Sequence, residues 1–148
     1  MRVLFVCLGN ICRSPAAEAV FAALAADRGV AVEVDSAGTS DYHIGETPHQ
    51  HTLAEARRRG VPIDHRARQV TDGDFRQFDL LVAVDGSTAR NLERMAPAGA
   101  DLGRIVTLEP AVADPWGHPP SAYAEMWDQL EEQCGELLDR IATAAEPA

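Results

Sequence analysis

An apolar run, followed at once by a turn and a helical pattern, constrains this chain more than any other feature of its sequence. The run Val3-Leu4-Phe5-Val6 is rich in β-branched and aromatic residues and predicts a buried strand. The residues that follow include Gly9 and Asn10, which favour a tight turn. From residue 16 onward an alanine-rich stretch has helical periodicity. The turn therefore joins the end of a strand to the start of a helix.

The start of this helix predicts an anion-binding loop. Ser14 is expected as the N-cap and Pro15 as the first helical residue, because the missing proline N–H would have no intrahelical partner there. Gly9 and Asn10 can adopt positive φ at little cost, so the backbone of the turn can curl until successive N–H groups point inward. A concave row of amides at a helix N-terminus binds anions.

Two reactive side chains lie at the two ends of this loop. The helix dipole and the inward amides favour the thiolate form of Cys7, which is the nucleophilic form. The Arg13 guanidinium presents a planar fork that matches phosphate oxygens. A nucleophile and a cation six residues apart on one small loop predict phosphoryl transfer.

The whole segment Cys7-Leu8-Gly9-Asn10-Ile11-Cys12-Arg13-Ser14-Pro15 resembles the signature loop of the low-molecular-weight protein tyrosine phosphatases. A Cys-x5-Arg spacing alone would be a weak signal, but here the Gly, the Asn, the second Cys and the Ser-Pro pair all follow an N-terminal strand. The resemblance implies that Cys7 is the nucleophile and Arg13 the phosphate clamp. It also implies that substrate phosphate is bound by Leu8, Gly9, Asn10, Ile11, Cys12 and Ser14.

Three later segments extend the resemblance. Tyr42 follows a Ser-Ala-Gly-Thr segment and stands where the family has an aromatic wall of the substrate slot. His65 lies in a stretch similar to the family's His-x-Ala-Arg-Gln, whose histidine supports the loop asparagine by a hydrogen bond. Asp114-Pro115-Trp116 resembles the general-acid loop, which implies that Asp114 is the acid and Trp116 a second wall of the slot.

Other polar and sulfur side chains are expected to have structural roles. Asp85 is predicted to cap a helix, and Cys134 is predicted to lie in the core as a small apolar residue. His49 and His51 would point to different faces of a helix, so a solvated face is expected and no metal site.

The order of the predicted elements indicates an α/β fold. Strands are expected over residues 3–6, 30–34, 80–84 and 105–108, with helices between them. One of these helices is expected to begin at Thr47-Pro48, and a long closing helix to run from Ser121, with fraying after Ala142. Strands separated by helices pair in parallel, so we predict a four-stranded parallel sheet with helices on both faces. The length of 148 residues suits one domain over 1–148.

The composition excludes some partners and compartments. With 13 basic and 23 acidic side chains the formal net charge is −10, which disfavours nucleic acid and anionic membranes as partners. Three cysteines without regular spacing predict a reducing compartment, and no window is apolar enough for a membrane span. A cytoplasmic protein is expected, with no cofactor and no metal.

The resemblance implies hydrolysis of phosphotyrosine in proteins through a cysteinyl-phosphate intermediate. Because Cys12 lies only five residues from the reactive Cys7 on the same loop, we also predict reversible oxidation to a Cys7–Cys12 disulfide. Three alternatives stay open. A protein arginine phosphatase of this fold typically has Thr at the position of Ile11, and an arsenate reductase of this fold needs extra cysteines near residues 80 to 90. A non-catalytic phosphate-binding module would lack the nucleophile or the acid.

Overall fold

A computed structural model of the chain describes residues 1–145 and contains one parallel sheet. Its spatial order is β2-β1-β3-β4, and every pair of neighbours is parallel. This confirms the predicted α/β class and the four-stranded sheet. The strands are β1 (Arg2–Cys7), β2 (Glu33–Gly38), β3 (Leu80–Ala83) and β4 (Ile105–Thr107).

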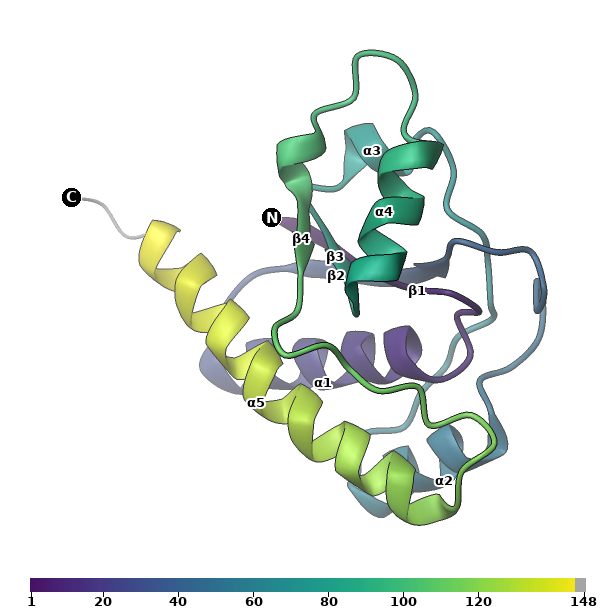
Figure 1. The fold of residues 1–148 in the computed structure, drawn as a ribbon. Helices are drawn as coiled ribbons and strands as arrows, with labels where there is room; N and C mark the ends of the chain where they lie inside the picture. The colour runs from purple at the N-terminus through teal and green to yellow at the C-terminus, as the bar shows by residue number, and fades with distance from the viewer. Residues whose placement is uncertain (146–148) are drawn as a thin grey trace.

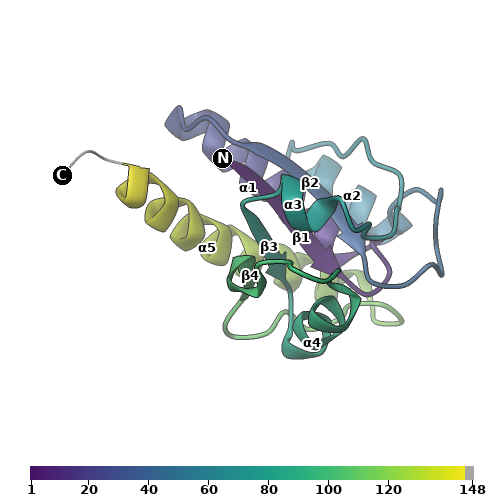
Figure 2. The same cartoon turned by 90° about the horizontal axis from the view of Figure 1, so that it is seen from above.

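Helices cover both faces of the sheet, as predicted (Figure 1). In Figure 1, α3 and α4 lie above the strands and α1 and α5 below them, and in the view from above α3 lies in front of the strands (Figure 2). A short 3-10 helix over Leu102–Arg104 leads into β4. The α-helices are α1 (Arg13–Arg28), α2 (Gln50–Arg58), α3 (Asp74–Gln77), α4 (Gly86–Met95) and α5 (Pro120–Ala145).

The central strand β1 supplies side chains to a separate core on each face. Val3 and Phe5 join the core beneath α1 and α5, where the Phe5 and Phe21 rings meet edge to face at 5.4 Å. Leu4 and Val6 join the core beneath α3 and α4. All these side chains are fully buried, and burial stabilises the fold by about 1.5–3 kcal/mol for each large apolar side chain. The end of β1 is therefore firmly anchored at the start of the phosphate loop.

Several predicted boundaries are wrong: β2 continues to Gly38 rather than ending at residue 34, and local hydrogen bonds explain two of the other differences. β2 begins at Glu33 rather than at residue 30, because the Val30 amide donates to Ala25 O and closes the end of α1. The second helix begins at Gln50 rather than at Thr47, because His49 is its N-cap. The His49 side chain accepts a hydrogen bond from the His51 amide, at 3.1 Å.

The expected closing helix is present as α5, and it packs along α1. Its apolar face, including Trp127, Leu130 and Cys134, is buried. The helix continues to Ala145 rather than fraying from Ala142, and the rest of the expected frayed tail, 146–148, lies outside the described residues. Among the helices that the structure describes, none is both long and apolar enough to cross a membrane.

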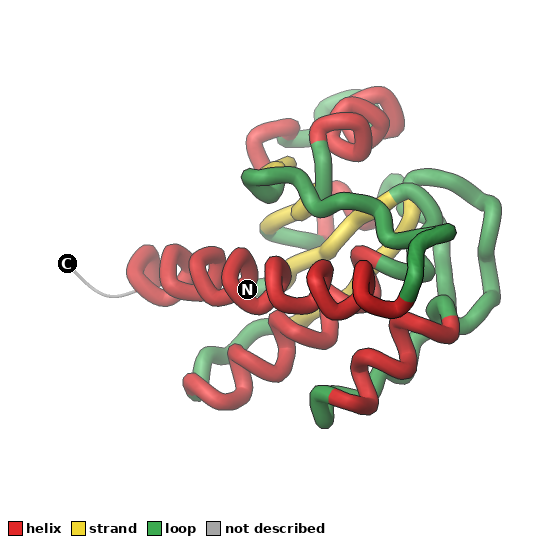
Figure 3. Tube along the Cα trace, turned by 60° about the horizontal axis from the view of Figure 1, so that its bottom comes forward, coloured by secondary structure: helices red, strands yellow, loops and turns green. Residues whose placement is uncertain are grey.

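The carboxyl ends of the strands point to the same end of the molecule. There the connecting loops gather beyond the strands in Figure 3. In a parallel sheet this is the end where ligands bind. The loop after β1, the residues after β2, Asp85 after β3 and the long segment before α5 all leave from it.

Candidate active site

The loop between β1 and α1 presents the Cys7 thiol to a cleft. The Cys7 Sγ lies 3.0 Å from Ser14 Oγ and 3.2 Å from the Asn10 amide, which donates to it. Ser14 Oγ accepts a hydrogen bond from Asn10 Nδ2 at 2.8 Å, so its own proton is free to be donated to the sulfur. Two donors directed at one sulfur stabilise its negative form.

The expected N-cap is wrong. The helix begins at Arg13, and Cys12 is the N-cap without a side-chain hydrogen bond. Ser14 lies fully buried in the first turn, because its hydroxyl contacts Cys7 and Asn10 instead of the helix backbone. The orphan amides of the helix N-terminus are therefore left for an anion.

Asn10 holds the curled loop together. It has the expected positive φ, 58°, and both the nitrogen and the oxygen of its buried side-chain amide make hydrogen bonds. Its Nδ2 donates to Ser14 Oγ and to Ser36 Oγ at 3.0 Å, while its Oδ1 lies 2.7 Å from His65 Nε2 and 3.0 Å from the Arg68 amide. The hydrogen bond expected between His65 and Asn10 is therefore present. Because a carbonyl oxygen only accepts, His65 Nε2 carries a proton.

The glycines of the site act through their small size. Gly9 does not use the left-handed region, contrary to expectation; a Cβ there would lie only 3.0 Å from His43 Cδ2. A Cβ on Gly38, at the end of β2, would lie 2.8 Å from Leu8 O. Both glycines therefore allow neighbouring chain segments to approach the loop closely.

Behind the loop, the half-buried acid Glu18 continues the network. Ser36 Oγ donates to Glu18 Oε1 at 2.6 Å, and Glu18 Oε1 also lies 3.5 Å from His65 Nδ1. Burial raises the pKa of Glu18 to about 7 and lowers that of His65. Glu18, Asp35 and His65 are also the group of described residues close enough to share a metal ion, but they do not line the cleft, and Arg68 already pairs with Asp35 at 3.0 Å.

Arg13 is positioned by a partner that sequence analysis missed. Its Nη1 donates to Asp85 Oδ2 at 2.7 Å and to Val112 O at 3.1 Å, and the side chain is buried. Asp85 is also the predicted helix cap, accepting from the Thr88 amide. Burial acts to raise the pKa of Asp85, but the hydrogen bonds from Thr88 and Arg13 hold it below its usual range. The available sequence signal was that Asp85 closely follows a predicted strand, which places it at the ligand-binding end of a parallel sheet.

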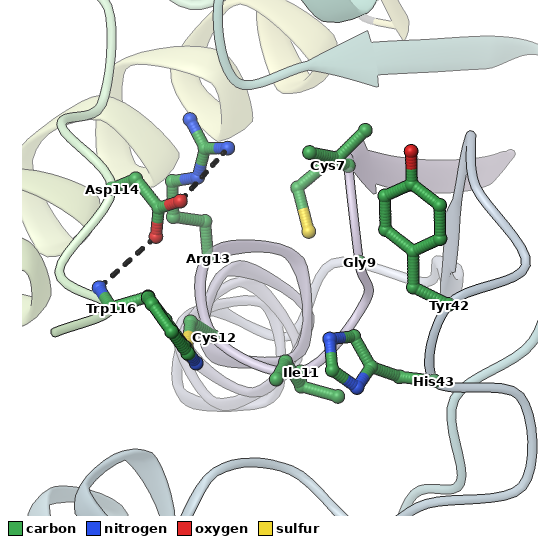
Figure 4. A pocket seen from close by; sticks show the side chains of 10 residues that line it. Cys7, Gly9, Ile11, Cys12, Arg13, Tyr42, His43, Asp114 and Trp116 are labelled. Carbon is green, nitrogen blue, oxygen red and sulfur yellow. Dashed lines mark hydrogen bonds and ion pairs between the residues drawn. The ribbon is translucent and has the colours of Figure 1, made fainter.

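Asp114 faces Arg13 from the long loop after β4. Its Oδ2 lies 4.0 Å from Arg13 Nη2, and its Oδ1 accepts a hydrogen bond from the Trp116 amide at 3.1 Å (Figure 4). The side chain is 52% exposed, in contrast to the buried Arg13. A carboxyl group therefore stands at the edge of the cleft, opposite the thiol.

The cleft measures about 190 Å³ and brings together most of the predicted site residues. Tyr42 and Trp116 are 70% and 61% exposed and form part of its rim (Figure 4). The lining residues are Cys7, Leu8, Gly9, Ile11, Cys12, Arg13, Tyr42, His43, Asp114 and Trp116. Three predicted site residues are absent from this lining, because Asn10, Ser14 and His65 support the loop from behind. His43 was not predicted.

The second loop cysteine is buried next to Tyr123. Cys12 Sγ lies 3.9 Å from Tyr123 Oη, and burial raises the pKa of this thiol to about 11. His49 stacks on the Tyr123 ring at 5.3 Å, and His51 meets it edge-on at 5.2 Å. The expected solvated face for the two histidines is therefore wrong, since both pack behind the loop.

A parallel α/β sheet that delivers a cysteine, an arginine and a carboxylic acid to one amide-lined loop has the arrangement of a cysteine-dependent phosphatase. Comparison with known families agrees: the profile of the family described as "Low molecular weight phosphotyrosine protein phosphatase" matches residues 2–146. The chain belongs to this family.

Similar proteins cover nearly the whole chain. The low molecular weight protein-tyrosine-phosphatase of Streptomyces coelicolor is 43% identical over 147 residues, which are 96% of this chain and 89% of the relative. A protein tyrosine phosphatase of Entamoeba histolytica, solved with Hepes in its active site, superposes with a TM-score of 0.93 at 31% identity and 99% coverage of both chains. A Drosophila arginine phosphatase superposes with a TM-score of 0.91 at 29% identity, covering 95% of this chain and 98% of its own.

Proposed function

We propose that this chain hydrolyses phosphotyrosine in proteins by two displacements through a phosphorylated Cys7. The observation that carries the proposal is the convergence of Cys7, Arg13 and Asp114 on one cleft with aromatic side chains at its rim. The relatives named as tyrosine phosphatases support the same activity.

In the first displacement Cys7 Sγ attacks phosphorus. The backbone amides of the loop and the Arg13 guanidinium hold the three equatorial oxygens, where negative charge is spread in the transition state. Arg13 is already oriented by Asp85 and Val112, so little reorganisation accompanies the reaction. Ser14 stabilises the sulfur anion before attack and as it departs later.

Asp114 supplies the proton that the leaving phenolate needs. It lies across the cleft from Cys7 (Figure 4). In-line attack by the sulfur expels the leaving oxygen on the side opposite the sulfur, so Asp114 is on the side of the leaving group. After the tyrosine product leaves, the same carboxylate accepts a proton from the water that attacks the phosphorylated cysteine. These steps use only side chains and water, so no metal or cofactor is invoked.

The cleft walls favour an aryl phosphate over the alternatives. Tyr42, Ile11 and Trp116 offer apolar surface to a flat ring. Arginine phosphate is the second candidate, because a Drosophila arginine phosphatase has the same fold, but Ile11 gives a guanidinium no polar partner. An arsenate relay would need further cysteines, and Cys134 is buried in the core. A binding module would not need Asp114.

The wider setting is proposed on chemical grounds. We place the protein in the cytoplasm, because Cys7, Cys12 and Cys134 are all free thiols. Tyrosine-phosphorylated proteins are the proposed partners, and residues 1–148 the catalytic domain. Oxidation to a Cys7–Cys12 disulfide stays a prediction, and the raised pKa of Cys12 leaves Cys7 as the thiol that oxidants attack first.

The test is turnover of p-nitrophenyl phosphate with a chelator present, comparing the parent with Cys7→Ser and Arg13→Lys. We expect Cys7→Ser to bind inorganic phosphate but turn nothing over, because the loop is intact and the nucleophile is lost. Arg13→Lys should lose both, because a point charge replaces a planar fork. Substantial turnover by Cys7→Ser would refute the mechanism. If the parent reacts faster with phosphoarginine than with phosphotyrosine, phosphoarginine would replace phosphotyrosine as the proposed substrate.

A further inference from the structure

His43 lines the cleft but has no part in the mechanism above. Its ring lies against the phosphate loop, at the place where a Cβ on Gly9 would come within 3.0 Å of His43 Cδ2. In Figure 4 the ring lies below Tyr42 and beside Ile11, and one ring nitrogen points into the cleft. The imidazole therefore forms part of the surface that a bound substrate meets.

The ring is held in a defined orientation by the turn that carries it. His43 Nδ1 lies 2.8 Å from Glu46 Oε2, and the Glu46 amide donates to His43 O at 2.9 Å. The turn is tied to the 64–69 segment by two backbone hydrogen bonds of 2.8 Å, from Gly45 N to Ala67 O and from Ala67 N to Glu46 O. Because a carboxylate only accepts, Nδ1 carries the proton and Nε2 is the nitrogen left for a ligand.

His43 Nε2 differs from most polar atoms of the cleft because its side chain can carry a positive charge. Of the residues that line the cleft, only Arg13 and His43 can carry a positive charge. Arg13 is buried and already paired with Asp85, whereas His43 is about one-third exposed. Charged or titratable groups near His43 include Glu46 on its own turn, Arg66, which donates to Gly45 O from the neighbouring segment, and Cys7 and Asp114 in the cleft.

We propose that His43 selects among phosphotyrosine substrates by the charge of the residues that flank the phosphotyrosine. The inference rests on the proposed function, since a phosphotyrosine bound through Cys7 fills the cleft and leaves its flanking residues at the rim. A protonated imidazole donates from Nε2 and favours a neighbouring aspartate or glutamate. The neutral ring presents a lone pair there, so it repels a carboxylate and favours an amide donor.

The experiment compares kcat/KM for two phosphopeptides that differ only in having Asp or Asn on both sides of the phosphotyrosine. Measurements at about pH 5 and about pH 8 span the range in which histidine changes charge. Effects of pH that act equally on the two peptides cancel in the Asp/Asn ratio. For the parent we expect the ratio to fall by about two- to fivefold between the two pH values, as for a partly exposed ion pair.

Two variants separate this role from a structural one. His43→Gln keeps a polar side chain without a titrating charge, so its ratio should be equal at both pH values. His51→Gln removes a histidine outside the cleft and should keep the pH dependence of the parent. The inference is overturned if the parent ratio does not change with pH, or if His43→Gln retains the change. Failure of the parent to hydrolyse p-nitrophenyl phosphate would instead refute the proposed function.

Discussion

The two halves of the active site are built in opposite ways. In the phosphate loop Asn10, Arg13 and Ser14 are buried, and the Asn10 side chain makes hydrogen bonds to Ser14, Ser36 and His65. On the acid loop, Asp114 is half-exposed. It accepts one hydrogen bond from the Trp116 amide, and its Oδ2 lies 4.0 Å from Arg13 Nη2. Both halves follow the carboxyl end of a strand, so the difference lies in the contacts around each loop.

This difference matches what each half must do. Equatorial phosphate oxygens carry charge throughout the reaction, and stabilising them without reorganisation requires donors held fixed in advance. A general acid must exchange protons with a leaving group and then with water, so it needs access to solvent. Rigid support therefore belongs around Arg13 and the loop, and exposure belongs to Asp114.

Among substitutions that leave Cys7 and Arg13 in place, the largest effect should come from the exposed half. Asp114→Asn removes the transferable proton, and a general acid contributes about 10²–10⁴-fold to such a step. We expect a loss of this size for formation of phosphorylated Cys7 from phosphotyrosine, and a much smaller loss for p-nitrophenyl phosphate, whose leaving group needs no proton. The measurement is the single-turnover rate across aryl phosphates of different leaving-group pKa. Parallel slopes for parent and variant would exclude Asp114 as the acid.

A smaller effect should come from the support of Arg13. Asp85→Asn keeps an oxygen for the Thr88 amide but loses the charge opposite Arg13, so kcat/KM should fall about ten- to hundredfold, as when a hydrogen bond to a charged group is weakened. Asp85→Ala serves as the companion variant, because it also loses the helix cap, at a cost of about 0.5–2 kcal/mol in unfolding free energy. Equal activity of parent and Asp85→Asn would show that Val112 O suffices to orient Arg13.

The smallest effect should be on stability and should depend on pH. Burial raises the pKa of folded Glu18 to about 7 from its usual 4.5, so between these values the folded state binds more protons than the unfolded state. The parent therefore loses stability as pH rises through this window. The glutamine of Glu18→Gln does not titrate, so the unfolding free energy of this variant should increase relative to that of the parent by on the order of 2 kcal/mol across the window.

Denaturant unfolding of both proteins at several pH values measures this gain. The neighbouring His65, whose pKa burial lowers, gives the parent the opposite trend with pH, so the difference between the two proteins is the quantity to follow. A difference that stays constant with pH would mean that Glu18 is ionised in the folded protein like an ordinary surface carboxylate.

Local sequence determined the parts of the site that lie within one short segment. The apolar run before Cys7, the turn-forming Asn10 and the Cys-x5-Arg spacing specify a strand, a curled loop and a helix almost independently of the rest of the chain. Resemblance to a family added His65 and Asp114, which are far from the loop in sequence. The N-cap could not be predicted, because Ser14 uses its hydroxyl for the Cys7 sulfur, a contact invisible in local propensity.

Tertiary structure alone decided which distant side chains meet the loop. Asp85 reaches Arg13 because β3 pairs directly with β1 and ends at the same edge of the sheet. His43 reaches Gly9, and His49 and His51 reach Tyr123, because the segment after β2 folds back over the loop and is tied there by the hydrogen bond from His49 N to Ile11 O. A chain's own pattern encodes the period and turns of each element, whereas contacts between elements depend on strand order and packing that no single segment contains.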